Sequence, residues 1–181
     1  MALDTRGSMS MLQRVRAELD RLTPEQALAE QERGALLIDL RTSTHRATSA
    51  IIPGSLVIDL TVLPWRLDPT FEYRIPEATG WDNRYILFCR HGYSSSLAAW
   101  NLRQLGLSRA TDMVGGYDAW VEAALPTTTI RLTNGPERHF VETHSQTRIS
   151  PPAGQTHRNS PKNYYTHVLV CSNVDHDSDA T

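Results

Sequence analysis

The stretch YILFCRHGYSSSLAAWNLRQLG, residues 85–106, decides the fold of this 181-residue chain. Its first four residues are apolar without interruption, which is typical of a parallel strand buried on both faces. Apolar residues then recur at helical spacing up to Leu105, and Gly106 ends the pattern. The sequence therefore predicts a buried strand over 85–88 and a helix over 95–105, joined by a short loop that begins at Cys89.

A helix is also predicted upstream of this stretch. Thr23 and Gln26 are spaced as a capping box, and Pro24 suits the first helical position. The helix should run to about Arg33, with Gly34 as its stop.

Three further strands and a last helix complete the predicted domain. The strands are short runs at 35–40, 55–58 and 110–114, and the helix covers 117–124. Residues 63–73 are broken by two prolines and are expected to form a loop with at most a helical turn. Strands that alternate with helices predict an α/β fold, with a mainly parallel sheet covered by helices on both faces.

Composition divides the chain into three parts. We expect 1–18 to be an N-terminal leader whose first ten residues are unstructured, and 19–127 to be a domain with its own hydrophobic core. Residues 128–181 are rich in Thr, Ser, Asn, Pro and His, which predicts a largely disordered C-terminal tail. Its best candidate for a strand is 164–171, and its five histidines lack compact metal-ligand spacing, so no metal site is expected.

Charge, hydropathy and cysteine content exclude several classes of protein. A formal net charge of −2 favours neither nucleic acid nor a membrane surface as a partner. The chain has no apolar run of the ~20 residues that span a bilayer, and residues 1–20 lack the apolar core of a signal peptide. Two cysteines are too few for a disulfide scaffold. We therefore expect a cytoplasmic protein in which Cys171 is an ordinary tail cysteine or, alternatively, a resolving thiol for Cys89.

The loop that begins at Cys89 carries the chemistry. A helix N-terminus presents unpaired amides and partial positive charge, which stabilise a thiolate. Gly92 lets the backbone curl so that successive N–H groups form an anion-binding nest. Arg90 and His91 add positive charge at the rim, and the serines that follow offer hydroxyl groups. The expected substrate-binding residues are Arg90, His91, Gly92, Tyr93, Ser94 and Ser95.

This loop resembles the active-site pattern of the rhodanese family, Cys-x-x-Gly-x-(Arg/Thr/Ser) at the start of a helix. Other motifs of the family follow in its order. Residues 37–41 resemble its hydrophobic-Asp-x-Arg strand, 52–55 its His-Ile-Pro-Gly-Ala turn, and 114–120 its Gly-Gly-x-x-Ala-Trp close. On these matches the chain is identified as a single-domain member of the family, with a rhodanese-like fold over 19–127.

The resemblance implies a sulfurtransferase whose nucleophile is Cys89. The thiolate would take a sulfane sulfur from a small anionic donor such as thiosulfate, hold it as a persulfide, and pass it to a thiol or protein acceptor. No metal or organic cofactor is implied. Asp39 and Arg41 are expected to support the site through hydrogen bonds and ion pairing.

Two alternatives follow from the same resemblance. A rhodanese-like module can act without turnover, as a sulfur carrier or as a redox sensor that reports oxidants through Cys89. Related phosphatases and arsenate reductases have an arginine at the seventh position of the loop. Here that position is Ser95, which disfavours their chemistry. The order Cys-Arg-His-Gly-Tyr-Ser resembles the thiosulfate-using subgroup more closely than the mercaptopyruvate-using one.

Overall fold

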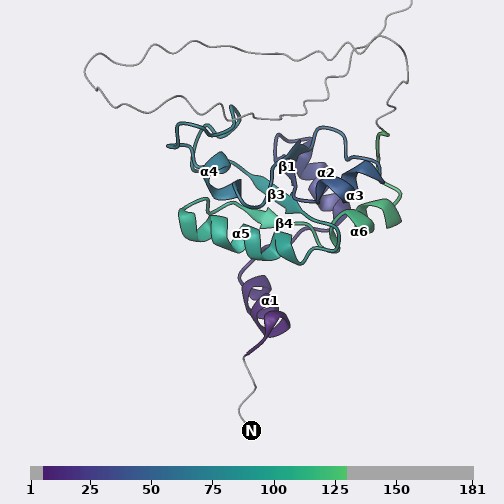
Figure 1. The fold of residues 1–181 in the computed structure, drawn as a ribbon, viewed down its shortest axis with the longest axis horizontal. Helices are drawn as coiled ribbons and strands as arrows, with labels where there is room; N and C mark the ends of the chain where they lie inside the picture. The colour runs from purple at the N-terminus through teal and green to yellow at the C-terminus, as the bar shows by residue number, and fades with distance from the viewer. Residues whose placement is uncertain (1–5, 130–181) are drawn as a thin grey trace, which may run out of the picture. The chain divides into compact units, whose positions relative to one another are not determined.

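A parallel β-sheet forms the centre of the computed structural model, which describes residues 6–129. The sheet has four strands in the order β2-β1-β3-β4 (Figure 1). They span Leu36–Asp39 (β1), Leu56–Val57 (β2), Tyr85–Phe88 (β3) and Thr111–Asp112 (β4), and each adjacent pair is parallel. The predicted α/β fold is confirmed. The strand at 85–88 has its predicted bounds, and the other three predicted strands are present in a shorter form.

Helices cover both faces of this sheet, as predicted. They are α1 (Ser8–Ala17), α2 (Pro24–Gln31), α3 (Ser43–Ala47), α4 (Leu63–Leu67), α5 (Ser94–Leu105) and α6 (Gly116–Glu122). Two hydrophobic cores result, one between the sheet and α4 with α5, the other between the sheet and α2 with α6 (Figure 1). Ile38 and Leu87 belong to the first core, whereas Leu37 and Ile86 belong to the second. Successive strand residues alternate between faces, which is why these strands are apolar throughout.

The predicted capping box and the predicted glycine stops are both present in the structure. The Thr23 hydroxyl accepts from the Gln26 amide at 3.3 Å, and the Gln26 side chain accepts from the Thr23 amide at 2.9 Å. Gly34 and Gly106 follow α2 and α5 with φ of 97° and 114°, a backbone conformation that glycine adopts without strain.

Several elements differ from the sequence expectations. The first ten residues were expected to be unstructured, yet α1 begins at Ser8 and buries Leu12 and Val15. The five-residue helix α3 was not predicted, because it buries no residue and so leaves no hydrophobic period. Thr128, assigned to the tail, pairs with Ile51 through two backbone hydrogen bonds of 2.9 Å. Expectations for 130–181, including its strand, histidines and Cys171, lie outside the described residues.

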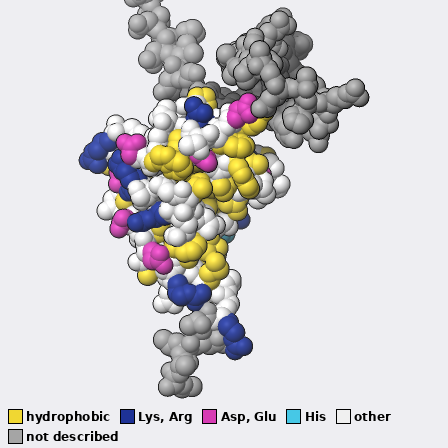
Figure 2. Space-filling model, turned by 90° about the vertical axis from the view of Figure 1, so that its left-hand side faces the viewer, with side chains coloured by type: hydrophobic (Ala, Val, Ile, Leu, Met, Phe, Trp, Pro, Cys, Tyr) yellow, Lys and Arg dark blue, Asp and Glu magenta, His cyan; other side chains and the backbone are white. Residues whose placement is uncertain are grey.

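Some large apolar side chains in and near α4 are exposed to solvent. Trp65 is 53% exposed and Tyr73 57% exposed. A view toward the left-hand side of Figure 1 shows hydrophobic side chains gathered in the middle of that face, with charged groups around them (Figure 2). Among the helices of residues 6–129, none is long and apolar enough to cross a bilayer.

Leu87→Ala is expected to lower the free energy of unfolding by about 2–5 kcal/mol, because it leaves a cavity in the centre of the sheet. Leu87 is fully buried, whereas Leu105 on α5 is 39% exposed. The matched control Leu105→Ala should therefore cost about 1 kcal/mol or less. Urea titration of the two variants beside the wild type measures the difference. Equal losses would contradict the described core.

Candidate active site

Cys89 lies at the carboxyl edge of the sheet, where strands give way to the next elements. It directly follows β3, and the parallel register places Asp39, the last residue of β1, beside Phe88. A cleft of about 480 Å³ opens at this edge. One wall comes from the loop between β3 and α5, and the other from residues 40–48 after β1. Sites of α/β sheets form at this edge because the strands end and the helices begin there.

The cysteine loop, residues 89–94, turns its first two peptide carbonyls toward α6. The carbonyl of Cys89 accepts from the amide of Tyr117 at 2.9 Å, and that of Arg90 accepts from the amide of Asp118 at 3.1 Å. In a trans peptide the following N–H points the opposite way, so the amides of Arg90 and His91 face the inside of the loop. Within residues 6–129, neither amide donates to a backbone carbonyl. Both therefore remain available to an anion on the cysteine.

Two glycines make this close approach of loop and helix possible. A Cβ on Gly116 would lie 2.4 Å from the carbonyl oxygen of Cys89, and its φ is 64°. A Cβ on Gly92 would lie 3.1 Å from the carbonyl oxygen of Met113, and its φ is 76°. A side chain at position 116 would separate α6 from the loop carbonyls that it holds. Both glycines are thus needed for the loop to close on itself.

Beneath the loop lies a buried polar network centred on Asp112. The carboxylate of Asp112 is fully buried and pairs with both nitrogens of the Arg21 fork, at 2.8 and 3.0 Å. It accepts from the Ser96 hydroxyl at 2.7 Å and lies 3.5 Å from the Ser95 hydroxyl. The Ser95 hydroxyl is in turn 3.5 Å from the sulfur of Cys89. A chain of polar contacts thus connects the thiol to a buried ion pair.

Arg90 and His91 share a single carboxylate at the rim. They contact Asp118 at 3.2 and 3.1 Å, and all three side chains are about half exposed. The positive charge of Arg90 is therefore partly neutralised where an anion would approach.

Asp39 and Arg41 form a buried ion pair that links the end of β1 to neighbouring elements. The Arg41 guanidinium meets the Asp39 carboxylate at 2.7 and 3.0 Å, and neither side chain is exposed. The same guanidinium donates to the Ser49 hydroxyl at 2.9 Å and lies 3.7 Å from the centre of the Tyr117 ring. Arg41 thus connects the end of β1 to the residue of α6 that binds the Cys89 carbonyl.

His45, which no sequence pattern indicated, also lines the cleft. Burial lowers the pKa of its imidazole below the ordinary value, and the charges of Arg90 and Arg41 act in the same direction. Its Nδ1 is buried and has no hydrogen-bond partner among the described residues. The side chain meets the Tyr117 ring edge to face, with ring centres 6.3 Å apart. His45 therefore brings a neutral imidazole to the wall opposite the cysteine loop.

The predicted site residues take three different positions. Cys89, Arg90, His91, Tyr93 and Ser94 line the cleft together with Arg41. Gly92 and Ser95 are buried below the loop surface, and Asp39 lies behind Arg41. Missing from the prediction were Arg16, Arg21, His45, Ser96 and Asp112. An aspartate inside an otherwise buried strand was the signal available for Asp112, since buried carboxylates need partners.

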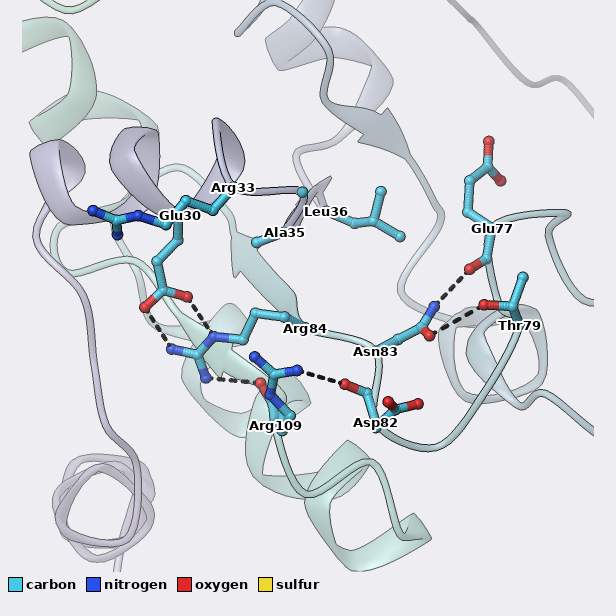
Figure 3. A pocket seen from close by; sticks show the side chains of 11 residues that line it. Glu30, Arg33, Ala35, Leu36, Glu77, Thr79, Asp82, Asn83, Arg84 and Arg109 are labelled. Atoms are coloured by element: carbon cyan, nitrogen blue, oxygen red, sulfur yellow. Dashed lines mark hydrogen bonds and ion pairs between the residues drawn. The ribbon is translucent and has the colours of Figure 1, made fainter.

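A second, larger cavity of about 710 Å³ lies at the opposite edge of the sheet, at the amino ends of β1 and β3 (Figure 3). Two of its arginines are engaged with neighbouring groups. Arg84 pairs with Glu30 at 2.6 Å and donates to the carbonyl of Arg109 at 2.8 Å, and Arg109 donates to the carbonyl of Asp82 at 2.9 Å. Throughout residues 6–129, no three His, Cys, Asp or Glu side chains are grouped so that they could hold a metal ion.

Fold and site together define a parallel α/β domain with a cysteine in an amide-lined loop at the carboxyl edge of its sheet. The family model of the rhodanese-like domain matches residues 23–123. That match covers more than half of the chain, and the protein belongs to the rhodanese-like domain family.

Individual proteins agree with this assignment. Thiosulfate sulfurtransferase GlpE of Haemophilus influenzae is 31% identical over 105 residues, which cover 58% of this chain and 90% of that protein. Adenylyltransferase and sulfurtransferase MOCS3-2 of Zea mays is 36% identical over 93 residues, 51% of this chain and 19% of that protein. A solved structure from Rhodopseudomonas palustris, a protein of unknown function described as a possible tyrosine phosphatase, superposes with a TM-score of 0.62. It is 27% identical and covers 71% of this chain and 98% of that one.

His45→Gln is expected to gain stability relative to the wild type as the pH falls through about 6.5, the ordinary pKa of histidine. Above that pH the imidazole is neutral in both the folded and the unfolded chain. Below it the unfolded chain binds the proton first, because the pKa in the folded chain is lower, and acid therefore destabilises the wild type through this group.

Urea unfolding in neutral and in mildly acidic buffer measures this effect. His91→Gln, which removes an exposed histidine from the same cleft, is the control and should show no such gain. A difference between His45→Gln and the wild type that stays constant over this range would contradict a partly buried, neutral His45.

Proposed function

We propose that the protein transfers a sulfane sulfur through a persulfide on Cys89, from a small anionic donor such as thiosulfate to a thiol or protein acceptor. The observation that carries this proposal is the loop that holds the Cys89 and Arg90 carbonyls outward and turns amides inward. Inward amides stabilise the negative terminal sulfur of a persulfide in the way that an oxyanion hole stabilises oxygen. The 31% identical relative named thiosulfate sulfurtransferase, 90% of which the chain covers, supports the same chemistry.

The reaction has two displacement steps. The Cys89 thiolate attacks the outer sulfur of thiosulfate, a new S–S bond forms, and the original S–S bond breaks as sulfite leaves with the electron pair. An acceptor thiolate or cyanide then attacks the terminal sulfur of the persulfide. The persulfide bond breaks and the Cys89 thiolate is regenerated, which is the ping-pong pattern of covalent catalysis.

The site residues expected from the sequence each have a place in this scheme. The amides of the cysteine loop hold the charged sulfur, with Ser95 beside the thiol at 3.5 Å. Arg90, His91, Tyr93 and Ser94 lie where the donor enters. Asp39 and Arg41 position α6, and through it the loop, by the stacking of Arg41 on Tyr117.

Phosphate-ester chemistry is the second candidate, because the solved structure from Rhodopseudomonas palustris is described as a possible tyrosine phosphatase. In this chain the seventh loop position is Ser95, whose buried hydroxyl contacts Asp112 and not the cleft. No arginine from the loop's seventh position is therefore available to grip a phosphate. Sulfur transfer needs no such group.

Cys89→Ser is expected to abolish thiosulfate:cyanide sulfur transfer, because a serine hydroxyl cannot form the persulfide. Thiocyanate release by the purified protein measures the rate. Cys171→Ser is the matched control and should keep the wild-type rate, because cyanide takes the sulfur directly and no second thiol is required. An aryl phosphate is offered to the same three proteins.

The outcomes separate the candidate functions. Turnover that is lost only in Cys89→Ser supports the sulfurtransferase. A single persulfide on Cys89, detected by mass spectrometry without turnover, would instead identify a sulfur carrier. Hydrolysis of the aryl phosphate that depends on Cys89, without sulfur transfer, would identify a phosphatase.

Asp118→Asn is expected to lower the KM for thiosulfate by about two- to fivefold, the range for an exposed ion pair. The substitution frees Arg90 and His91 from the carboxylate that they share, and the positive charge of Arg90 is then fully exposed to the anionic donor. Added salt should shrink the effect, because exposed charges are screened. Glu122→Gln on the same helix is the matched loss of one negative charge and should leave KM unchanged. Equal KM values for Asp118→Asn and the wild type would contradict a role of Arg90 in attracting the donor at the rim.

A further inference from the structure

One more loop carbonyl is held outward, by a residue that lies outside the family match. The carbonyl of Gly92 accepts from Arg16 Nη2 at 2.7 Å and lies 2.8 Å from the Ser96 hydroxyl oxygen. Arg16 belongs to α1, whereas the rhodanese-like match begins at residue 23. A helix that precedes the matched region thus contacts the cysteine loop directly.

Arg16 fixes the loop at three points. Besides the Gly92 carbonyl, its Nε donates to the Ser96 hydroxyl at 3.2 Å, and its guanidinium carbon lies 5.4 Å from the centre of the Tyr93 ring. Because the Gly92 carbonyl points toward Arg16, the amide of Tyr93 in the same peptide points the opposite way, into the loop. The planar guanidinium makes these contacts with two different nitrogens, which the single ammonium of lysine reproduces poorly.

The helix that carries Arg16 is firmly docked. Leu12 and Val15 are buried, and Glu18 at its end accepts from two residues of α5. The Trp100 indole donates to the Glu18 carboxylate and the Arg103 guanidinium to the Glu18 carbonyl, each at 2.9 Å. Contacts both before and after Arg16 in the helix therefore fix its backbone relative to α5.

Arg16 also changes the charge beneath the loop. Arg21 and Asp112 form an ion pair and largely neutralise each other. Arg16 brings a further positive charge to the same network through Ser96. Burial lowers the pKa of Arg16 below its ordinary value, but a guanidinium stays protonated in proteins. The lower side of the cysteine loop thus faces net positive charge.

We propose that Arg16 is a positioning residue for the sulfur transfer proposed above, fixing the Gly92–Tyr93 peptide so that the Tyr93 amide faces the sulfur of Cys89. The inference rests on the proposed function for its kinetic effect, but not for its effect on the thiol. It extends the functional unit of this protein from the family match to α1. Arg16 touches neither donor nor acceptor and acts through the loop.

The test compares Arg16→Gln, Arg16→Lys and a matched control in the full chain. The control is Arg33→Gln, the same chemical change at an exposed residue beside the cavity at the opposite edge of the sheet. Three quantities are measured for each protein: kcat and KM for thiosulfate, the rate of Cys89 alkylation by iodoacetamide at neutral pH relative to high pH, and the melting temperature. The alkylation ratio reports the loop without any sulfur transfer.

We expect Arg16→Gln to lower kcat about 10- to 100-fold, as misplaced catalytic groups do, with a smaller change in KM. Its alkylation ratio should fall, and that of Arg16→Lys should lie between Arg16→Gln and the wild type because the charge is kept. Sulfur transfer by Arg16→Lys should stay close to that of Arg16→Gln, since the paired contacts are lost. Arg33→Gln should match the wild type throughout.

Two outcomes would overturn the inference. If Arg16→Gln lowers only the melting temperature and keeps the alkylation ratio and kcat, Arg16 is purely structural. If Arg16→Lys equals the wild type in both, charge alone matters and the peptide is not positioned by Arg16. Should the wild type transfer no sulfur, the proposed function fails, and the alkylation ratio still decides the role of Arg16.

Discussion

The site depends on the direction of a few peptide groups after β3. The carbonyls of Cys89, Arg90 and Gly92 all point away from the loop interior, so the amides that follow them point inward. Each carbonyl needs a donor, because an unpaired buried carbonyl is costly. The Cys89 and Arg90 carbonyls take theirs from the first turn of α6, which reaches them only because Gly116 has no side chain.

The need to hold the loop carbonyls outward also explains the role of residues that do not line the cleft. Tyr117 donates its amide to Cys89 while its ring lies 3.7 Å under the Arg41 guanidinium. Arg41 is held by the buried carboxylate of Asp39 at the end of β1. The ion pair, the aromatic ring and the loop carbonyl thus form one continuous series of contacts. A motif on β1 therefore supports a cysteine that is 50 residues later in the chain.

Local signals made the sheet and the cysteine loop predictable from sequence, whereas contacts between distant residues did not. Apolar runs, the Thr23 capping box and the glycine stops act within a few residues, and the structure has them at those positions. Arg16 and its partner Ser96 are 80 residues apart. α1 shows only two buried residues, and α3, which carries His45, shows none. The apolar residues of α1 are too few to reveal what the helix packs against, and α3 shows no apolar period, so their contributions to the site required the three-dimensional arrangement.

The structure also relocates the positive charge that the sequence attributed to the site. Arg90 and His91 were expected to attract the donor, but both share Asp118 at the solvent-exposed rim, where screening weakens each contact. The inward amides were expected from the sequence, whereas Arg16 was not, and Arg16 lies under the loop, where the lower dielectric makes its charge more effective. Charge in that position acts on the sulfur that cysteine holds and only weakly on the approaching donor. In the proposed reaction, this arrangement favours the persulfide and the transition states that lead to and from it over tight binding of free thiosulfate.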